Sequence, residues 1–259
     1  MGGRRAQRHG DPAAPAVIAL IAAVALAVPW APPPTSTFQW QLSGRLDLSV
    51  RADLYDVDLF ETSAADVARI HAMGARAACY FSAGTHEPGR PDSKAFPRSV
   101  IGQRLADWPR ERWLDVRRLS VLRPIMRRRL NLCAEKGFDA VEPDNVDGYA
   151  NDSGFALRGR HQLRFNRWLA RAAHARGLSI ALKNDLEQVR ALEPWYDWAL
   201  SEECFAYREC ARLKPFADAG KAVFVVEYAD GGFCPAARDL GFMAQRKRLA
   251  LDAWREPCW

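Results

Sequence analysis

Apolar runs recur along the chain at intervals typical of β-strands that are separated by helices. Seven runs have the length of buried strands and an eighth is weaker; they cover residues 37–42, 54–60, 75–81, 138–142, 178–182, 197–201, 222–227 and 249–253. A glycine stands one or two residues before four of them, at Gly74, Gly137, Gly177 and Gly220. This helix–glycine–strand rhythm predicts parallel strands joined by crossover helices.

Three of the intervening helices can be placed from their end signals. Thr62 and Ser63 cap a helix that runs to Met73, and a second helix ends at Lys136 with Pro124 in its first turn. A third ends before Gly177 and has one apolar face, formed by Phe165, Trp168, Leu169, Ala172 and Ala173. Eight strands in about 220 residues favour a (β/α)8 TIM barrel, in the α/β class, as a single domain.

The chain start is predicted to lie outside this domain. Arg4, Arg5 and Arg8 precede thirteen uninterrupted apolar residues, 16–28, a run too short to span a bilayer comfortably. We expect a signal peptide over residues 1–27, cleaved near Ala27, with an uncleaved membrane anchor as the alternative. A Pro-rich linker covers residues 28–37 and the barrel domain covers 38–259. The protein is therefore expected to be secreted or extracytoplasmic, with no stable membrane insertion after cleavage.

Six cysteines suit an oxidising compartment, where disulfides persist. The three candidate pairs are Cys204–Cys210, which closes a short loop, Cys234–Cys258 and Cys79–Cys133. Cys79 can equally be a buried free thiol. The sequence has neither a CxxC nor an HxxxH spacing, so a zinc site is not expected.

The charge of the chain is modestly positive. The formal net charge of +6 falls to about +4 without the signal segment. The densest basic clusters are residues 127–129 and 246–248, and both lie in amphipathic stretches, so we expect solvated helix faces there. No nucleic-acid partner is expected, and we expect a monomer.

Polar and charged residues follow the ends of nearly every predicted strand, and parallel strands in a barrel end at one face. The segment 137–149 is the densest case, with four carboxylates within nine residues. Crowded acids repel one another and give the fold little stability. Their presence at a strand end therefore indicates a chemical function for this segment, and a solvated acidic loop without such a function is the alternative. The residues at this rim are Asp56, Asp58, Tyr80, Glu142, Asp144, Lys183, Asn184, Glu202, Glu203, Glu227, Tyr228 and, from the weak eighth strand, Asp252.

This set of residues favours carboxylate chemistry, because no Ser-His-Asp arrangement is legible. Glycoside hydrolysis needs two carboxyl groups beside the scissile bond, one protonated and one ionised. Asp144 and Glu202 end different strands and can face each other, with Lys183 between them to hold one of them ionised. Aromatic side chains that can stack on sugar rings are Trp40, Tyr80, Tyr149 and Tyr228, although Trp40 and Tyr80 can equally be core residues.

The chain resembles the glycoside hydrolase family 114 barrels, the endo-α-1,4-polygalactosaminidases, from about Phe38 to Trp254. The resemblance rests on eight short stretches in order: residues 40–44 (WQLSG), 55–60 (YDVDLF), 79–84 (CYFSAG), 113–117 (WLDVR), 142–147 (EPDNVD), 182–184 (LKN), 202–205 (EECF, with Cys210) and 226–228 (VEY).

The resemblance implies a secreted, endo-acting hydrolase of α-1,4-linked galactosamine or N-acetylgalactosamine polymers, without a cofactor and without a metal. It implies Asp144 and Glu202 as the catalytic carboxylates; Glu203 is the alternative, since adjacent residues in a strand face opposite ways. The substrate-binding candidates are Trp40, Asp58, Tyr80, Lys183, Asn184, Glu203, Glu227 and Tyr228. A non-catalytic polysaccharide-binding barrel and a glycosidase with another polysaccharide substrate remain alternatives, and retention or inversion stays open.

Overall fold

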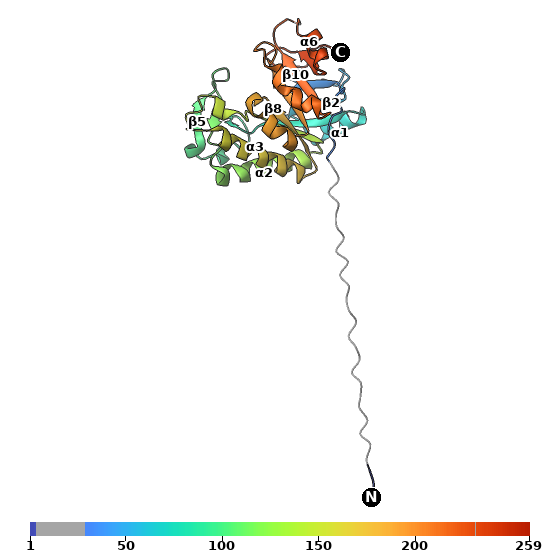
Figure 1. The fold of residues 1–259 in the computed structure, drawn as a ribbon, viewed down its shortest axis with the longest axis vertical. Helices are drawn as coiled ribbons and strands as arrows, with labels where there is room; N and C mark the ends of the chain where they lie inside the picture. The colour runs from blue at the N-terminus through green and yellow to red at the C-terminus, as the bar shows by residue number, and fades with distance from the viewer. Residues whose placement is uncertain (4–28, 231) are drawn as a thin grey trace.

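Eight parallel strands follow one another in sequence order around a TIM barrel (Figure 1). The computed structural model describes residues 1–3, 29–230 and 232–259, so the expected signal segment lies almost wholly outside the described residues. The strands of the barrel are β1 (Phe38–Gln41), β2 (Leu54–Asp58), β3 (Arg76–Ser82), β7 (Ala140–Asp144), β8 (Ser179–Lys183), β9 (Trp198–Glu202), β10 (Val223–Glu227) and β11 (Met243–Arg246). The predicted fold class is confirmed.

The eighth strand is not where the sequence pattern placed it. Strand β11 is short and half of it is polar, so its apolar signal is weak, whereas residues 249–253 form a loop. The Leu251 carbonyl of this loop accepts hydrogen bonds from the N–H groups of Leu42 and Ser43, at 2.9 and 3.1 Å. Within the described residues no hydrogen-bonded ladder joins the last barrel strand, β11, to the first, β1. We call this junction the seam, and the loop over residues 249–253 covers it. Strand β11 also pairs antiparallel with β12 (Glu256–Pro257).

Lys247 fills this seam between β1 and the loop over residues 249–253. Its side chain is buried, and its Nζ donates to the carbonyl of Asp252 at 2.6 Å and lies 3.5 Å from Gln39 Oε1. The expectation of a solvated helix face over residues 246–248 was therefore wrong, because Arg246 ends a barrel strand and Lys247 enters the seam, while Arg248 is exposed but not helical.

Helices cover the outside of most strands. They are α1 (Ala64–Ala72), α2 (Leu119–Glu135), α3 (Gly159–His174), α4 (Val189–Leu192), α5 (Lys214–Asp218) and α6 (Cys234–Asp239), with 3-10 turns at Ser93–Ala95, Arg98–Val100, Gly148–Ala150, Leu186–Gln188, Glu193–Trp195 and Cys210–Leu213. Ser63 caps α1, as the sequence predicted, and the structure adds a capping box with Asp66. Helix α2 begins at Leu119, so Pro124 is its sixth residue and not, as predicted, part of its first turn.

An antiparallel insertion separates β3 from α2. Its strands β4 (Thr85–His86), β5 (Ile101–Arg104) and β6 (Arg112–Leu114) are arranged in the order β4-β6-β5. In Figure 1 the strand β5 lies at one end of the molecule, away from β10 and α6. The sequence pattern missed this sheet, because its strands are only two to four residues long.

Alternate residues of the barrel strands face two separate cores. The inner core fills the barrel and includes Trp40, Ala78, Ala140, Leu200 and Phe224. The outer core lies between the sheet and the helices. Because side chains alternate along a strand, the inner set also determines which residues at the strand ends reach the barrel mouth.

Helices α2 and α3 pack together and display a concentration of arginines. We call this surface the arginine face; it comprises Arg123, Arg127, Arg128, Arg160, Arg164, Arg167 and Arg171. Helix α3 contains no acidic residue, and the one acid of α2 is Glu135 at its end. Arg123 and Arg127 stack on Trp168, at 5.5 and 5.9 Å from the ring centre.

Arg129 departs from the expected solvated cluster. Its side chain is buried, and its guanidinium binds the Asp92 carboxylate at 2.8 Å through both Nε and Nη2. It thus ties α2 to the insertion, while its neighbour Arg128 is exposed.

Three disulfides link the pairs that the sequence suggested. They are Cys79–Cys133, Cys204–Cys210 and Cys234–Cys258, so Cys79 is not a free thiol. They fit a protein that works in an oxidising compartment. In the part of the chain that the structure describes, no helix is long and apolar enough to cross a membrane.

Candidate active site

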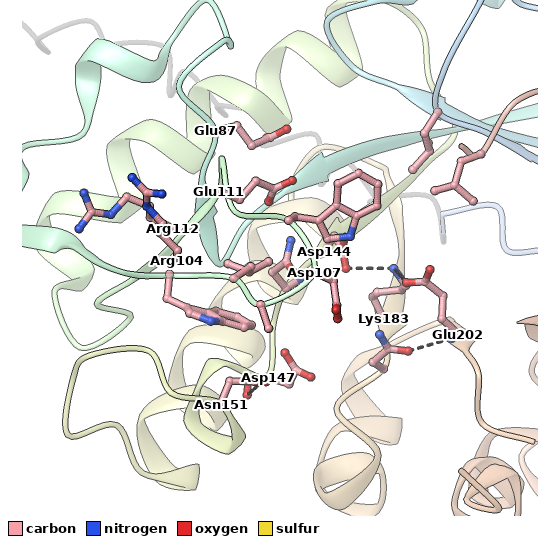
Figure 2. A pocket seen from close by; sticks show the side chains of 18 of the residues that line it. Glu87, Arg104, Asp107, Glu111, Arg112, Asp144, Asp147, Asn151, Lys183 and Glu202 are labelled. Atoms are coloured by element: carbon pink, nitrogen blue, oxygen red, sulfur yellow. Dashed lines mark hydrogen bonds and ion pairs between the residues drawn. The ribbon is translucent and has the colours of Figure 1, made fainter. Parts of the chain in front are cut away.

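A cleft of about 860 Å³ opens at the carboxyl ends of the barrel strands. One wall comes from the strand ends and the other from the insertion and the loops beside it (Figure 2). Six of the predicted site residues line it: Trp40, Tyr80, Asp144, Lys183, Asn184 and Glu202. Residues far apart in the sequence therefore meet in one groove.

Lys183 occupies the centre of the cleft floor. Its side chain is 1% exposed, and its Nζ lies 2.7 Å from Glu202 Oε2, 3.0 Å from Asp144 Oδ1 and 3.5 Å from Glu142 Oε1. Burial by itself lowers the pKa of Lys183, but these carboxylates together raise it well above its ordinary value. The ammonium group is thus held charged between the two predicted carboxylates (Figure 2).

Asp144 receives three hydrogen bonds. Besides Lys183, the Asn145 N–H donates to Oδ1 at 2.7 Å and the Tyr80 hydroxyl donates to Oδ2 at 3.1 Å. Donors of this kind favour the ionised form of a carboxyl group. Burial raises the pKa of Tyr80 well above its ordinary value, so its hydroxyl keeps the proton that it donates.

Glu202 and Glu203 lie on different sides of the strand end. Trp198 and Leu200 belong to the inner core, so Glu202, two residues further on, reaches the barrel mouth. Its carboxylate accepts from Lys183 and from the Tyr228 hydroxyl. Glu203 has a φ of 56° and its side chain is not part of the cleft lining. The geometry therefore favours Glu202 over Glu203 as the partner of Asp144.

Left-handed backbone follows three of the strands that carry site residues. Asn145 after β7, Asn184 and Asp185 after β8 and Glu203 after β9 have φ between 48° and 59°. Such conformations cost energy in residues other than glycine and gather at functional sites. The turn at Asn184 also directs its Oδ1 to accept the Glu202 N–H at 2.9 Å, which fixes the end of β9.

Besides Glu203, three predicted binding residues do not line the cleft. Asp58 is buried and binds the Arg90 guanidinium at 2.6 Å, and Arg90 itself lines the cleft. Glu227 follows the outward-facing Val225, and its carboxylate accepts the N–H groups of Phe205 and Ala206 instead. Tyr228 contacts the site only through Glu202.

The insertion and neighbouring loops contribute charged residues that the sequence reasoning missed. Glu111 accepts a hydrogen bond from the Thr85 hydroxyl at 2.6 Å, and burial raises the pKa of Glu111 to about 7. Burial likewise raises the pKa of Asp147 to about 6. The acidic residues of the lining are Glu87, Asp107, Glu111, Asp144, Asp147, Asp152 and Glu202, and the basic ones are Arg90, Arg104, Arg112 and Lys183. Their only sequence signal was the acidic run that contains Asp147.

Asp56 and Glu142, which the sequence analysis placed at the rim but did not choose as catalytic or binding residues, are two buried acids below the floor. Both are 0% exposed. Glu142 Oε2 accepts a hydrogen bond from Trp40 Nε1 at 3.0 Å. Strand parity could have identified them, because both occupy inward positions in register with Trp40 and Tyr80.

The described residues contain one group of potential metal ligands, Cys204, Cys210 and Glu227. Its two sulfurs form a disulfide, so they cannot act as thiolate ligands. The chemistry that the cleft itself offers is that of two carboxylates held on either side of an ammonium group.

A barrel whose strand ends present paired carboxylates in an open cleft defines the class of the protein, a glycoside hydrolase. The model of glycoside-hydrolase family GH114 matches residues 20–259, and the chain belongs to that family. A search of curated proteins finds no significant match.

Two solved structures illustrate the similarity. Aspergillus fumigatus Ega3, solved in complex with galactosamine, is 36% identical with a TM-score of 0.86, and the match covers 89% of this chain and 98% of that one. The glycoside hydrolase domain of PelA from Pseudomonas aeruginosa is 14% identical with a TM-score of 0.70, over 85% and 97% of the two chains. The second likeness concerns the fold alone.

Proposed function

We propose that this protein is an exported, endo-acting hydrolase of α-1,4-linked galactosamine or N-acetylgalactosamine polymers, with Asp144 and Glu202 as its catalytic carboxylates. The observation that carries the proposal is the placement of both carboxylates within 3.0 Å of the buried Lys183 ammonium in one open cleft. The similarity to Ega3, which binds galactosamine, supports the substrate class. The three disulfides support export.

The proposed roles follow the two-carboxylate mechanism of retaining glycosidases. Asp144, which accepts hydrogen bonds from Lys183, Tyr80 and the Asn145 N–H, attacks the anomeric carbon, while Glu202 in its acid form gives its proton to the leaving oxygen. The glycosidic C–O bond breaks and an ester to Asp144 forms. Water then attacks the anomeric carbon, Glu202 takes the water proton, and the ester bond breaks.

The same geometry favours retention of configuration. Since Asp144 Oδ1 and Glu202 Oε2 lie 3.0 and 2.7 Å from one atom, they are at most about 5.7 Å apart, close to the roughly 5–5.5 Å of retaining enzymes and below the 6.5–9.5 Å of inverting ones. We therefore propose that the first product carries the α configuration.

Turnover by the full chain tests the proposal. Asp144→Asn and Glu202→Gln should each lower kcat/KM on α-1,4-galactosamine oligomers by at least about 10²-fold. Glu203→Gln should retain most turnover, because that side chain lies outside the cleft lining. NMR of the first product reports its configuration. Near-normal rates in both Asp144→Asn and Glu202→Gln contradict the assigned roles.

The alternative is a barrel that binds the polysaccharide without cleaving it. The presence of both carboxylates in one cleft favours the enzyme. Polymer binding without any new reducing ends, under conditions where the chain is folded, supports the binding module instead. Cleavage of an unrelated polysaccharide with no effect on galactosamine polymers supports a different substrate.

A further inference from the structure

Asp56 and Glu142 form a contact that two ionised carboxylates cannot maintain. Their carboxyl groups are hydrogen-bonded to each other. No N–H or O–H group of the described residues donates to either oxygen of Asp56 or to Glu142 Oε1. A hydrogen bond between two acceptors requires a proton on one of them.

The charges around this pair limit it to one proton. Two fully buried carboxylates in contact would repel each other in a medium that solvates neither. If both acids were protonated, the Glu142 hydroxyl could donate to Asp56, but the Asp56 hydroxyl would have no acceptor of its own among the described residues. The remaining oxygen of the pair, Glu142 Oε2, already accepts from Trp40. One shared proton gives the pair a single negative charge facing Lys183, whose Nζ lies 3.5 Å from Glu142 Oε1.

We propose that Asp56 and Glu142 share one proton and act as positioning residues that keep the Lys183 ammonium between Asp144 and Glu202. Lys183 stands nearer to those two, at 3.0 and 2.7 Å, than to Glu142. The shared proton reduces the negative charge of the pair and so weakens its attraction for the Lys183 ammonium. The ammonium therefore stays beside Asp144 and Glu202 and does not move toward Glu142. Neither member of the pair lines the cleft.

The pair also responds to pH. Burial raises the pKa of Asp56 to about 7, and burial together with the Asp56 contact raises that of Glu142 well above its ordinary value. The charged and titratable groups that face the pair are Asp144 on the same strand as Glu142, Lys183 on β8, Glu202 on β9 and Tyr80 on β3.

Loss of the shared proton at alkaline pH has a direct consequence. It adds a second negative charge below Lys183 and draws the ammonium away from Asp144 and Glu202. Turnover should then decline. This consequence rests on the proposed function, whereas the shared proton does not.

Infrared difference spectroscopy of the full chain at pH 6 tests the proton itself. The double variant Asp56→Asn/Glu142→Gln should lose a single C=O stretch of a protonated buried acid relative to wild type. No band lost means that both acids are ionised, and two bands lost mean that both are protonated; either result overturns the proposal. If the double variant does not fold, Glu111→Gln, Asp147→Asn and Asp185→Asn identify the wild-type bands of the other buried acids with a raised pKa. One band should then remain for the pair, and none or two overturns the proposal.

The pH profile of kcat tests the positioning role. The double variant Asp56→Asn/Glu142→Gln has no proton to lose at this place, so its alkaline limb should move to higher pH by at least about one unit, a tenfold rate difference on that limb. A lower kcat at every pH with an unmoved limb indicates a structural role only and overturns the positioning claim. If wild type cleaves no galactosamine polymer, the proposed function fails while the infrared result still decides the shared proton.

Discussion

Replacement of Lys183 by glutamine should destabilise the protein strongly at neutral pH. The side chain is 1% exposed and its ammonium contacts Asp144 and Glu202 within 3.0 Å. Charges about 3 Å apart interact by about 5 kcal/mol at an effective dielectric constant near 20. Desolvation of the ammonium offsets part of this, and removal of one partner of a buried ion pair typically costs about 3–5 kcal/mol. We expect Lys183→Gln to lower the free energy of unfolding by that amount at pH 7.

The pH dependence of this loss identifies its cause. Burial lowers the pKa of Lys183, but the neighbouring carboxylates raise it well above its ordinary value, so the stability that its ammonium contributes is fully present below the unfolded pKa of about 10.4 and is lost as pH rises above it. The penalty of Lys183→Gln should therefore be the same at pH 7 and pH 9 and shrink above about pH 10.4. Urea unfolding followed by circular dichroism at these pH values measures it.

Lys221→Gln provides the matched control. Lys221 also binds a carboxylate, Glu193 Oε1 at 2.7 Å, but its side chain is 26% exposed. Its loss should cost about 1 kcal/mol. The reasoning is refuted if Lys183→Gln costs no more than Lys221→Gln at pH 7, or if its penalty does not shrink above about pH 10.4.

Three further changes have defined outcomes. Burial raises the pKa of Asp185 to about 8, so the folded state keeps a proton that the unfolded state releases near pH 4, and stability falls as pH rises between these values. Asp185→Asn should therefore have a larger unfolding free energy than wild type at pH 8, by more than about 1 kcal/mol. Equal midpoints of urea unfolding for the two proteins at pH 8 contradict this. Cys204→Ser/Cys210→Ser opens a short loop and should lower the unfolding free energy by about 2–3 kcal/mol relative to the oxidised wild type, read by thermal unfolding of both proteins without reductant. Trp108 is 52% exposed at the cleft, so Trp108→Ala should leave the melting temperature unchanged while raising KM for long oligomers more than for short ones; equal KM changes exclude a distal sugar contact.

Periodicity predicted the fold because each long strand is buried on both sides and most are preceded by a helix and a glycine. It failed at β11, where only four residues pair and two of them are polar. It also failed for the insertion, whose strands are stabilised by neighbours far away in sequence. Short elements of this kind carry too few apolar positions to be recognised in advance.

The candidate site followed from strand ends, and side-chain parity accounts for most of what the sequence analysis missed. Glu227 ends a strand, but the inner core takes Val226, so Glu227 faces outward. The same rule, applied to β2 and β7, would have selected Asp56 and Glu142. The residues of the facing wall could not be found this way, because they belong to the insertion and to loops.

The arginine face changes what the overall charge of the chain means. Its seven arginines exceed the formal net charge of +6, so the rest of the chain sums to −1, and the cleft lining alone sums to −3, with seven acids against four bases. The protein thus carries a positive surface on α2 and α3 and a negative surface at the mouth of the barrel. A polycation that approaches from solution is repelled by the arginine face and attracted to the cleft, and this orientation during encounter should weaken as salt is added.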